Sequence, residues 1–319
     1  MTTRLARVGA GTAALAGLLS FGATAGNAAA TSDDAKAVTG QILARVNGDL
    51  AAVRADNGAV VRTYSNTIDG KWSPNKTRLA YTQPVNYDIG MGVMNADGTG
   101  RTIIPNRLPE DKPSFSADGQ WIIYSECNNP YSEFVCDIYR IKSTAPFGAP
   151  VKITNAQWQP TTGPCAGYEA EYYLWAAWKP NSRLIAVTHG CYNPNGHKSI
   201  PEVVNVDTRA VIARGTFSGE NATWSPDGKR IAWTEWAPTS AIRVTSADLK
   251  TGFRLTSPSA PEAMSGRWPA WSPDSTRVAW TRGWSMTNRI VHSAATAGAP
   301  VTVVKTAPNN TTLPVLDWK

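Results

Sequence analysis

A ten-residue pattern recurs along this chain and constrains its fold more than any other feature. Each copy begins with an aromatic residue, passes through a turn such as Ser-Pro-Asp-Gly, and continues as an alternating apolar segment; residues 224–233 read WSPDGKRIAW. Five copies and the start of a sixth begin at Trp72, Phe115, Trp178, Trp224, Trp271 and Trp318. Their spacings of 43, 63, 46, 47 and 47 residues are typical of a repeat architecture.

Each copy has the composition of a β-hairpin. Serine and proline suit the first two positions of a type I turn, and glycine suits its fourth. After the turn, Ile231 and Trp233 face one side of the strand and Ala232 the other, and the recurring alanine indicates that both sides are packed. We therefore interpret Ser225 and Asp227 as turn formers, since other copies replace the equivalent residues and no G-x-S-x-G motif occurs. No catalytic residue is assigned.

Further strands complete each repeat. In the first, residues 91–94 form a third strand, a turn follows at 95–98, and residues 102–104 form a fourth strand. Four antiparallel strands in 43 to 47 residues predict one blade of a β-propeller.

The W-S-P-D-G-x-x-I-A-W/F pattern resembles the TolB-type, or WD-like, β-propeller repeat, and the resemblance covers nearly all of the chain after residue 30. It implies six blades. The founding protein of that family also carries an α/β domain before its propeller. This sequence leaves no room for such a domain, so a role in the Tol system is not expected.

The sixth blade is predicted to combine both ends of the chain. Segments 41–46, 49–53 and 59–63 have the pattern of second, third and fourth strands, and residues 315–318 supply the innermost one. This pairing removes the exposed edges of the ring and ties the termini together. The expected fold is an all-β, six-bladed propeller.

The first thirty residues have the layout of a secretory signal peptide. Arg4 and Arg7 precede an apolar run over 8–23, and three alanines at 28–30 form an exit of the A-x-A kind. No later segment is apolar enough for a membrane span. We expect residues 31–319 to form one propeller domain that is secreted, extracellular, monomeric and not inserted in a membrane.

Charge and cysteine content exclude several kinds of ligand. The formal charge of +7 is spread along the chain without a Lys/Arg cluster, which argues against nucleic acid. Four cysteines in an exported chain predict two disulfides, and of three possible connectivities we favour the sequence neighbours, Cys127 with Cys136 and Cys165 with Cys191. No C-x-x-C pair occurs, and His189 and His197 share one expected loop without a third ligand, so no metal or cofactor is predicted.

Strand order assigns the loops to two faces of the ring. The Ser-Pro-Asp-Gly turns and the turns between third and fourth strands are short and share one face. The loops between second and third strands and the connections between blades, including the long one at 157–173, share the opposite, variable face. Both disulfides are expected there. Loops on a rigid scaffold carry most binding residues, and the candidates are Trp236, Arg267, Trp268, Arg282, Trp284, Tyr131, Tyr172 and Glu235.

Two functions fit this variable face. The first is a non-catalytic binding module for an extracellular protein, such as another exported enzyme, or for a cell-wall glycan, because Trp, Tyr and Arg are enriched at binding hot spots. The alternative is a carbohydrate-active lyase or hydrolase that uses a carboxylate pair drawn from Glu133, Glu169, Glu171 and Glu235. The aromatic rings also have a purely structural interpretation, as plugs of the channel mouth or covers of blade edges.

Overall fold

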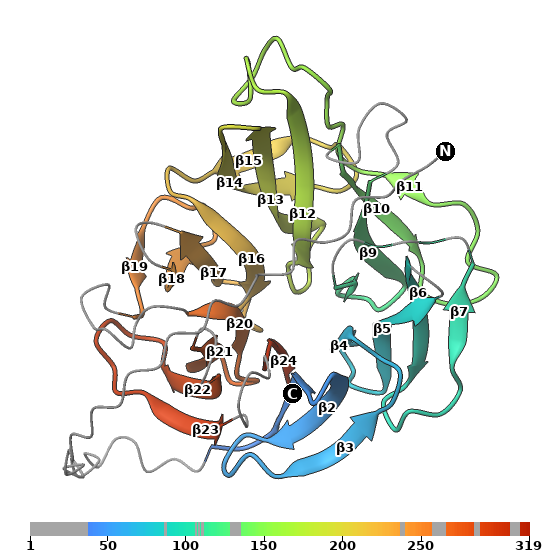
Figure 1. Ribbon diagram of the computed structural model, residues 1–319, viewed down its shortest axis with the longest axis vertical. Helices are drawn as coiled ribbons and strands as arrows, with labels where there is room; N and C mark the ends of the chain where they lie inside the picture. Colours follow the sequence, from blue (N-terminus) through green and yellow to red (C-terminus); the bar gives the residue numbers. More distant parts are fainter. Residues whose placement is uncertain are drawn as a thin grey trace, which may run out of the picture. The chain divides into compact units, whose positions relative to one another are not determined.

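The computed structural model describes residues 38–85, 88–105, 107, 109, 112–127, 135–236, 240–256, 266–283, 288–306 and 313–319. Within these residues, 24 strands form six antiparallel sheets of four strands each, and no helix occurs (Figure 1). The innermost strands contact one another in the closed cycle β4, β8, β12, β16, β20 and β24. The predicted six-bladed β-propeller is confirmed, whereas the leader predicted over residues 1–30 lies outside the described residues.

The blades are numbered in chain order from the first aromatic anchor. Blade 1 contains β4 (Asp69–Trp72), β5 (Arg78–Val85), β6 (Asp88–Asn95) and β7 (Thr102–Ile104). Blade 2 contains β8 (Ser114–Phe115), β9 (Trp121–Glu126), β10 (Asp137–Lys142) and β11 (Val151–Lys152). Blade 3 contains β12 (Ala170–Trp178), β13 (Leu184–Asn193), β14 (Gly196–Asn205) and β15 (Val211–Arg214). Blade 4 contains β16 (Gly219–Trp224), β17 (Arg230–Trp236), β18 (Ser240–Ser246) and β19 (Gly252–Arg254). Blade 5 contains β20 (Arg267–Trp271), β21 (Arg277–Arg282), β22 (Arg289–Ala294) and β23 (Thr302–Thr306). Blade 6 contains β24 (Val315–Trp318), β1 (Gln41–Val46), β2 (Asp49–Arg54) and β3 (Val60–Tyr64).

Blade 6 joins the two ends of the chain, as predicted. Its strand order is β24-β1-β2-β3, and Ile42 lies opposite Trp318 in the register. The backbones of Gln41 and Lys319 exchange two hydrogen bonds of 2.7 and 2.9 Å, which extend the ladder by one residue pair. The innermost strand of this blade is thus separated by more than 250 residues of sequence from its neighbour.

The repeated turns satisfy their own polar groups. In blade 4 the Gly228 N–H donates to the Ser225 carbonyl at 2.8 Å, closing the turn. The Ser225 hydroxyl donates to Asp227 Oδ1 at 2.5 Å, and that carboxylate also accepts the Lys229 N–H at 3.1 Å. Ser225 and Asp227 therefore act as turn formers, as the repeat comparison predicts.

Apolar side chains fill the space between neighbouring blades. Ile231 and Trp233 pack with Ala186 of blade 3, while Ala232 belongs to a second cluster with Trp271 and other residues of blades 4 and 5. Both faces of each sheet are consequently buried. The strand ends, the connecting loops, the central channel and the exposed outermost strands remain for binding.

Both predicted disulfides are present. Cys127 pairs with Cys136 across the loop between β9 and β10, and Cys165 pairs with Cys191, which lies near the end of β13. Both bonds lie on the variable face, and together they indicate an extracellular or periplasmic protein. Among the described residues, no helix is long and apolar enough to cross a bilayer.

Candidate functional site: a Trp–Arg patch on the variable face

Three predicted residues meet where blades 4 and 5 adjoin the channel. Trp236 ends β17, and Arg267 and Trp268 begin β20, so all three lie at strand ends on the variable face. The Arg267 guanidinium carbon is 4.4 Å from the centroid of the Trp236 ring and 5.9 Å from that of Trp268. These are cation–π distances. We call these three half-buried residues the Trp–Arg patch.

A buried carboxylate underlies this patch. Glu220, the second residue of β16, is 7% exposed. Its Oε2 accepts the Trp236 indole N–H at 2.8 Å, and its Oε1 accepts the Ser199 hydroxyl of blade 3 at 2.8 Å. Burial raises the pKa of Glu220, although these two hydrogen bonds partly oppose the rise. Burial also lowers the pKa of Arg267 to about 10, against the opposing charge of Glu220.

A repeated β-bulge positions the residues at these strand ends. Trp175, Asn221 and Trp268 each lie three residues before their aromatic anchor and have positive φ angles of 53°, 54° and 53°. The strand register shifts at this point in β12, β16 and β20. A bulge re-aims the side chains beside it. In blade 5 the register shift begins after Arg267, and Trp268 is the residue with the positive φ angle.

Tyr172 connects the same network to blade 3. Its ring covers Gly190 so closely that a Cβ at that position would lie 1.8 Å from the ring, so no other residue fits there without a rearrangement. Burial raises the pKa of the Tyr172 phenol, and the neighbouring Ser199 partly opposes the rise. The expectation that residues 168–173 lie wholly in a loop is wrong, because β12 begins at Ala170 and includes Tyr172.

Glu235 belongs to a separate ion-pair cluster. Its Oε2 lies 3.0 Å from Arg243 Nε and 2.8 Å from Arg254 Nε. Burial raises the pKa of this carboxyl, but the hydrogen bonds from Arg254 and Arg243 outweigh it and hold the pKa below its usual range. Arg282 ends β21 and is half-buried, with Arg289 opposite it in the register. Trp284 and Tyr131 lie outside the described residues.

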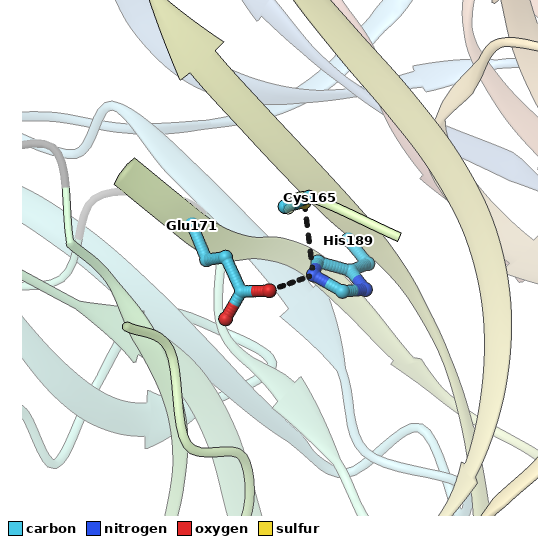
Figure 2. A group of neighbouring side chains, drawn as sticks. All are labelled: Cys165, Glu171 and His189. Atoms are coloured by element: carbon cyan, nitrogen blue, oxygen red, sulfur yellow. Dashed lines mark hydrogen bonds and ion pairs between the residues drawn. The ribbon is translucent and has the colours of Figure 1, made fainter. Parts of the chain in front are cut away.

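A second buried charge cluster lies in blade 3 (Figure 2). His189 Nε2 is 3.4 Å from Glu171 Oε1 and 3.4 Å from Cys165 Sγ, while Nδ1 is 3.1 Å from Glu202 Oε1. The Arg214 Nε–H donates to the same Glu202 oxygen at 2.7 Å. Burial lowers the pKa of His189, but hydrogen bonding to Glu171 and Glu202 and their charges outweigh it and leave the pKa raised.

This cluster corrects two expectations. His189 and His197 do not share a loop, because they lie in the paired strands β13 and β14. Glu171 does not lie in the connection expected at 157–173 but in β12, where it is 6% exposed and adjoins His189. Cys165, Glu171 and His189 have the donor types and proximity of a metal site. The Cys165 sulfur, however, is bonded to Cys191 and is not available as a thiolate.

Glu220 and Ser199 were not among the predicted site residues. Glu220 and Arg267 occupy the same repeat position, four residues before the anchors of adjacent blades. Blade 3 has Leu174 at that position. Opposite charges at equivalent positions of neighbouring repeats are therefore the signal that could have identified this pair.

No family model and no curated protein matches the sequence. Among solved structures, TolB of Acinetobacter baumannii is similar with a TM-score of 0.66 at 15% identity, covering 88% of this chain and 67% of that one. A candidate TolB of Agrobacterium tumefaciens gives 0.59 at 15% identity, covering 79% and 86%. A chain of a nidogen/laminin complex gives 0.60 at 9% identity, covering 87% and 97%. These similarities show a TolB-like propeller fold.

Proposed function

We propose that this TolB-like propeller is a secreted, non-catalytic binding module that holds a protein partner through the Trp–Arg patch. The observation that carries the proposal is that the Arg267 guanidinium lies within cation–π distance of both Trp236 and Trp268 at the variable-face end of the strands. Tryptophan, tyrosine and arginine are the residue types most enriched in binding hot spots.

The patch is preorganised, which favours binding. Glu220 fixes the Trp236 indole through a 2.8 Å hydrogen bond, and Ser199 fixes Glu220 from the neighbouring blade. Side chains that are already held in place lose less conformational entropy when a partner arrives. The two rings are only partly buried, so a partner can still cover their accessible parts.

Three carboxylates near this face have protein partners of their own, and this supports binding over hydrolysis. Glu235 is held by two arginines, Glu220 accepts two hydrogen bonds, and Glu171 adjoins His189. A glycosidase needs one carboxylate or acid placed to protonate the leaving group and a second on the opposite side of the bond. Because these three carboxylates already form hydrogen bonds or ion pairs within the protein, they do not favour the enzyme alternative.

An affinity capture from culture supernatant of the producing organism tests the proposal. Bait proteins are the native chain, Trp236→Ala, and Lys229→Ala as a control on the turn face. We expect one protein to be retained by the native chain and the control but lost by Trp236→Ala, and then to bind again in purified form. Equal retention by all three baits would refute the role of the patch. Retention of isolated cell-wall polysaccharide alone would assign the site to glycan, and release of soluble fragments from it would favour an enzyme.

A further inference from the structure

The opposite, turn-face end of the channel contains a cavity of about 400 Å³. Residues of all six blades line it, including the prolines of four repeated turns. Its wall is formed largely by the six aromatic anchors Trp72, Phe115, Trp178, Trp224, Trp271 and Trp318. A volume of this size falls within the range of small-molecule pockets, roughly 300–1,000 Å³.

Two charged residues interrupt the repeat pattern at this cavity. The residues that directly precede the six anchors are Lys71, Ser114, Ala177, Thr223, Ala270 and Asp317. Four of the six are small, as the crowded channel requires. Lys71 and Asp317 both line the cavity, and they come from the adjacent blades 1 and 6. Because four blades fold with a small residue at this position, the propeller fold does not require the lysine that blade 1 has there.

Lys71 forms no ion pair with a carboxylate of the described residues. Asp317 Oδ2 accepts the Trp72 backbone N–H at 3.0 Å, and among the described residues no carboxylate lies within 4.0 Å of the Lys71 ammonium nitrogen. Burial lowers the pKa of Lys71, while the charge of Asp317 raises it and that of Lys76 lowers it further. A poorly solvated ammonium gains strongly from an anionic partner.

The charges around the cavity favour an anion of low charge. Lys76 also lines it, and the Lys319 ammonium nitrogen is 4.5 Å from the Trp72 ring centroid. Asp317 repels any anion, but the repulsion increases with the charge of the ligand and is smallest for a monoanion. The turn aspartates are already engaged, because each accepts a serine hydroxyl and a backbone N–H: Asp118, Asp227 and Asp274.

We infer that the turn-face end of the channel binds a small organic acid. Its single carboxylate pairs with the Lys71 ammonium, and its ring packs against the aromatic anchors. Two common sources supply this chemistry, a sugar acid and an aromatic acid. The site lies at the end of the channel remote from the Trp–Arg patch, so its occupancy and the proposed protein binding can succeed or fail separately.

Isothermal titration of the purified chain tests this inference with four probes. Glucuronate and benzoate represent the two kinds of acid, and glucose and benzamide are their neutral counterparts. The variants are Lys71→Met, which removes the charge, Lys71→Arg, which keeps it, and Lys229→Met as a control at an exposed turn position outside the cavity lining. Thermal unfolding of each variant shows whether the propeller is intact.

We expect at least one acid to bind, with its neutral counterpart at least about tenfold weaker, as befits a charge-assisted hydrogen bond. Lys71→Met should weaken binding by a similar factor, Lys71→Arg should retain most of it, and Lys229→Met should change it by less than about twofold. Binding of glucuronate alone would identify a sugar-acid site, and binding of benzoate alone an aromatic-acid site. The inference is overturned if neither acid binds the native chain at 10 mM, if a neutral probe binds as well as its acid, or if a folded Lys71→Met variant binds unchanged.

Discussion

Removal of strand β24 is expected to unfold the whole propeller, although the strand has only four residues. Val315, Leu316 and Trp318 are each at most 4% exposed. Burial of one valine or leucine side chain contributes about 1.5–3 kcal/mol. Loss of a buried tryptophan costs roughly 3–5 kcal/mol, so the strand contributes on the order of 8 kcal/mol. The net stability of a domain is only about 5–15 kcal/mol.

The assay is urea unfolding of a chain without residues 314–319, followed by circular dichroism. A matched pair of single variants is Trp318→Ala and Val303→Ala, since Val303 lies in the outer strand β23 and is 45% exposed. We expect the truncated chain to lack a cooperative transition, Trp318→Ala to lose about 4 kcal/mol, and Val303→Ala to resemble the native chain. A synthetic peptide of residues 313–319 should restore folding. A truncated chain with the native urea midpoint would refute closure by this strand.

The remaining predictions concern buried charges and the longer disulfide. The pKa of His189 is raised in the fold, so protonated His189 adds its full contribution to the unfolding free energy below a pH of about 6.5, and this contribution is lost as the pH rises through the raised pKa. The unfolding free energy of His189→Gln should lack this decrease with pH. Equal pH dependence of the unfolding free energy in the variant and the native chain would contradict the prediction. Burial raises the pKa of Glu220, so its ionisation destabilises the fold as pH rises; Glu220→Gln should melt higher than the native chain at pH 8 but not at pH 3.5, and an unchanged difference would argue against this. Replacing Cys165 and Cys191 by alanine opens a 26-residue loop and should cost about 3.5 kcal/mol of unfolding free energy in urea, and an unchanged unfolding free energy would contradict this expectation.

The repeat explains why so much of the fold follows from the sequence. The residues of each copy predict two strands and the turn between them, and the alternation along each strand predicts which side chains face a neighbouring blade. Even the pairing of residues 315–318 with residues 41–46 follows, because only that arrangement completes a sixth unit. The two disulfides follow from a different rule, the pairing of sequence neighbours, because all four cysteines are expected on one face and the face alone does not select the partners.

Contacts across blades are harder to predict, because a local pattern does not specify how neighbouring sheets pack. Tyr172 was expected in a loop, yet its strand begins two residues earlier and its ring covers Gly190. Glu235 is next to Trp236 in sequence, but consecutive residues of a strand point to opposite faces. It therefore joins Arg243 and Arg254 rather than the Trp–Arg patch. The cavity beside Lys71 depends on all six blades together.

The most direct test of the binding proposal is the affinity of the captured partner for three purified forms of the chain. Trp236→Ala removes the ring over Arg267 and the hydrogen bond to Glu220, so we expect a loss of about 2 kcal/mol or more, or roughly thirtyfold in Kd. Lys229→Ala, in a turn on the opposite face, should leave Kd within about twofold of the native value. An unchanged Kd for a folded Trp236→Ala variant, or a comparable loss for Lys229→Ala, would contradict the assignment of binding to the Trp–Arg patch.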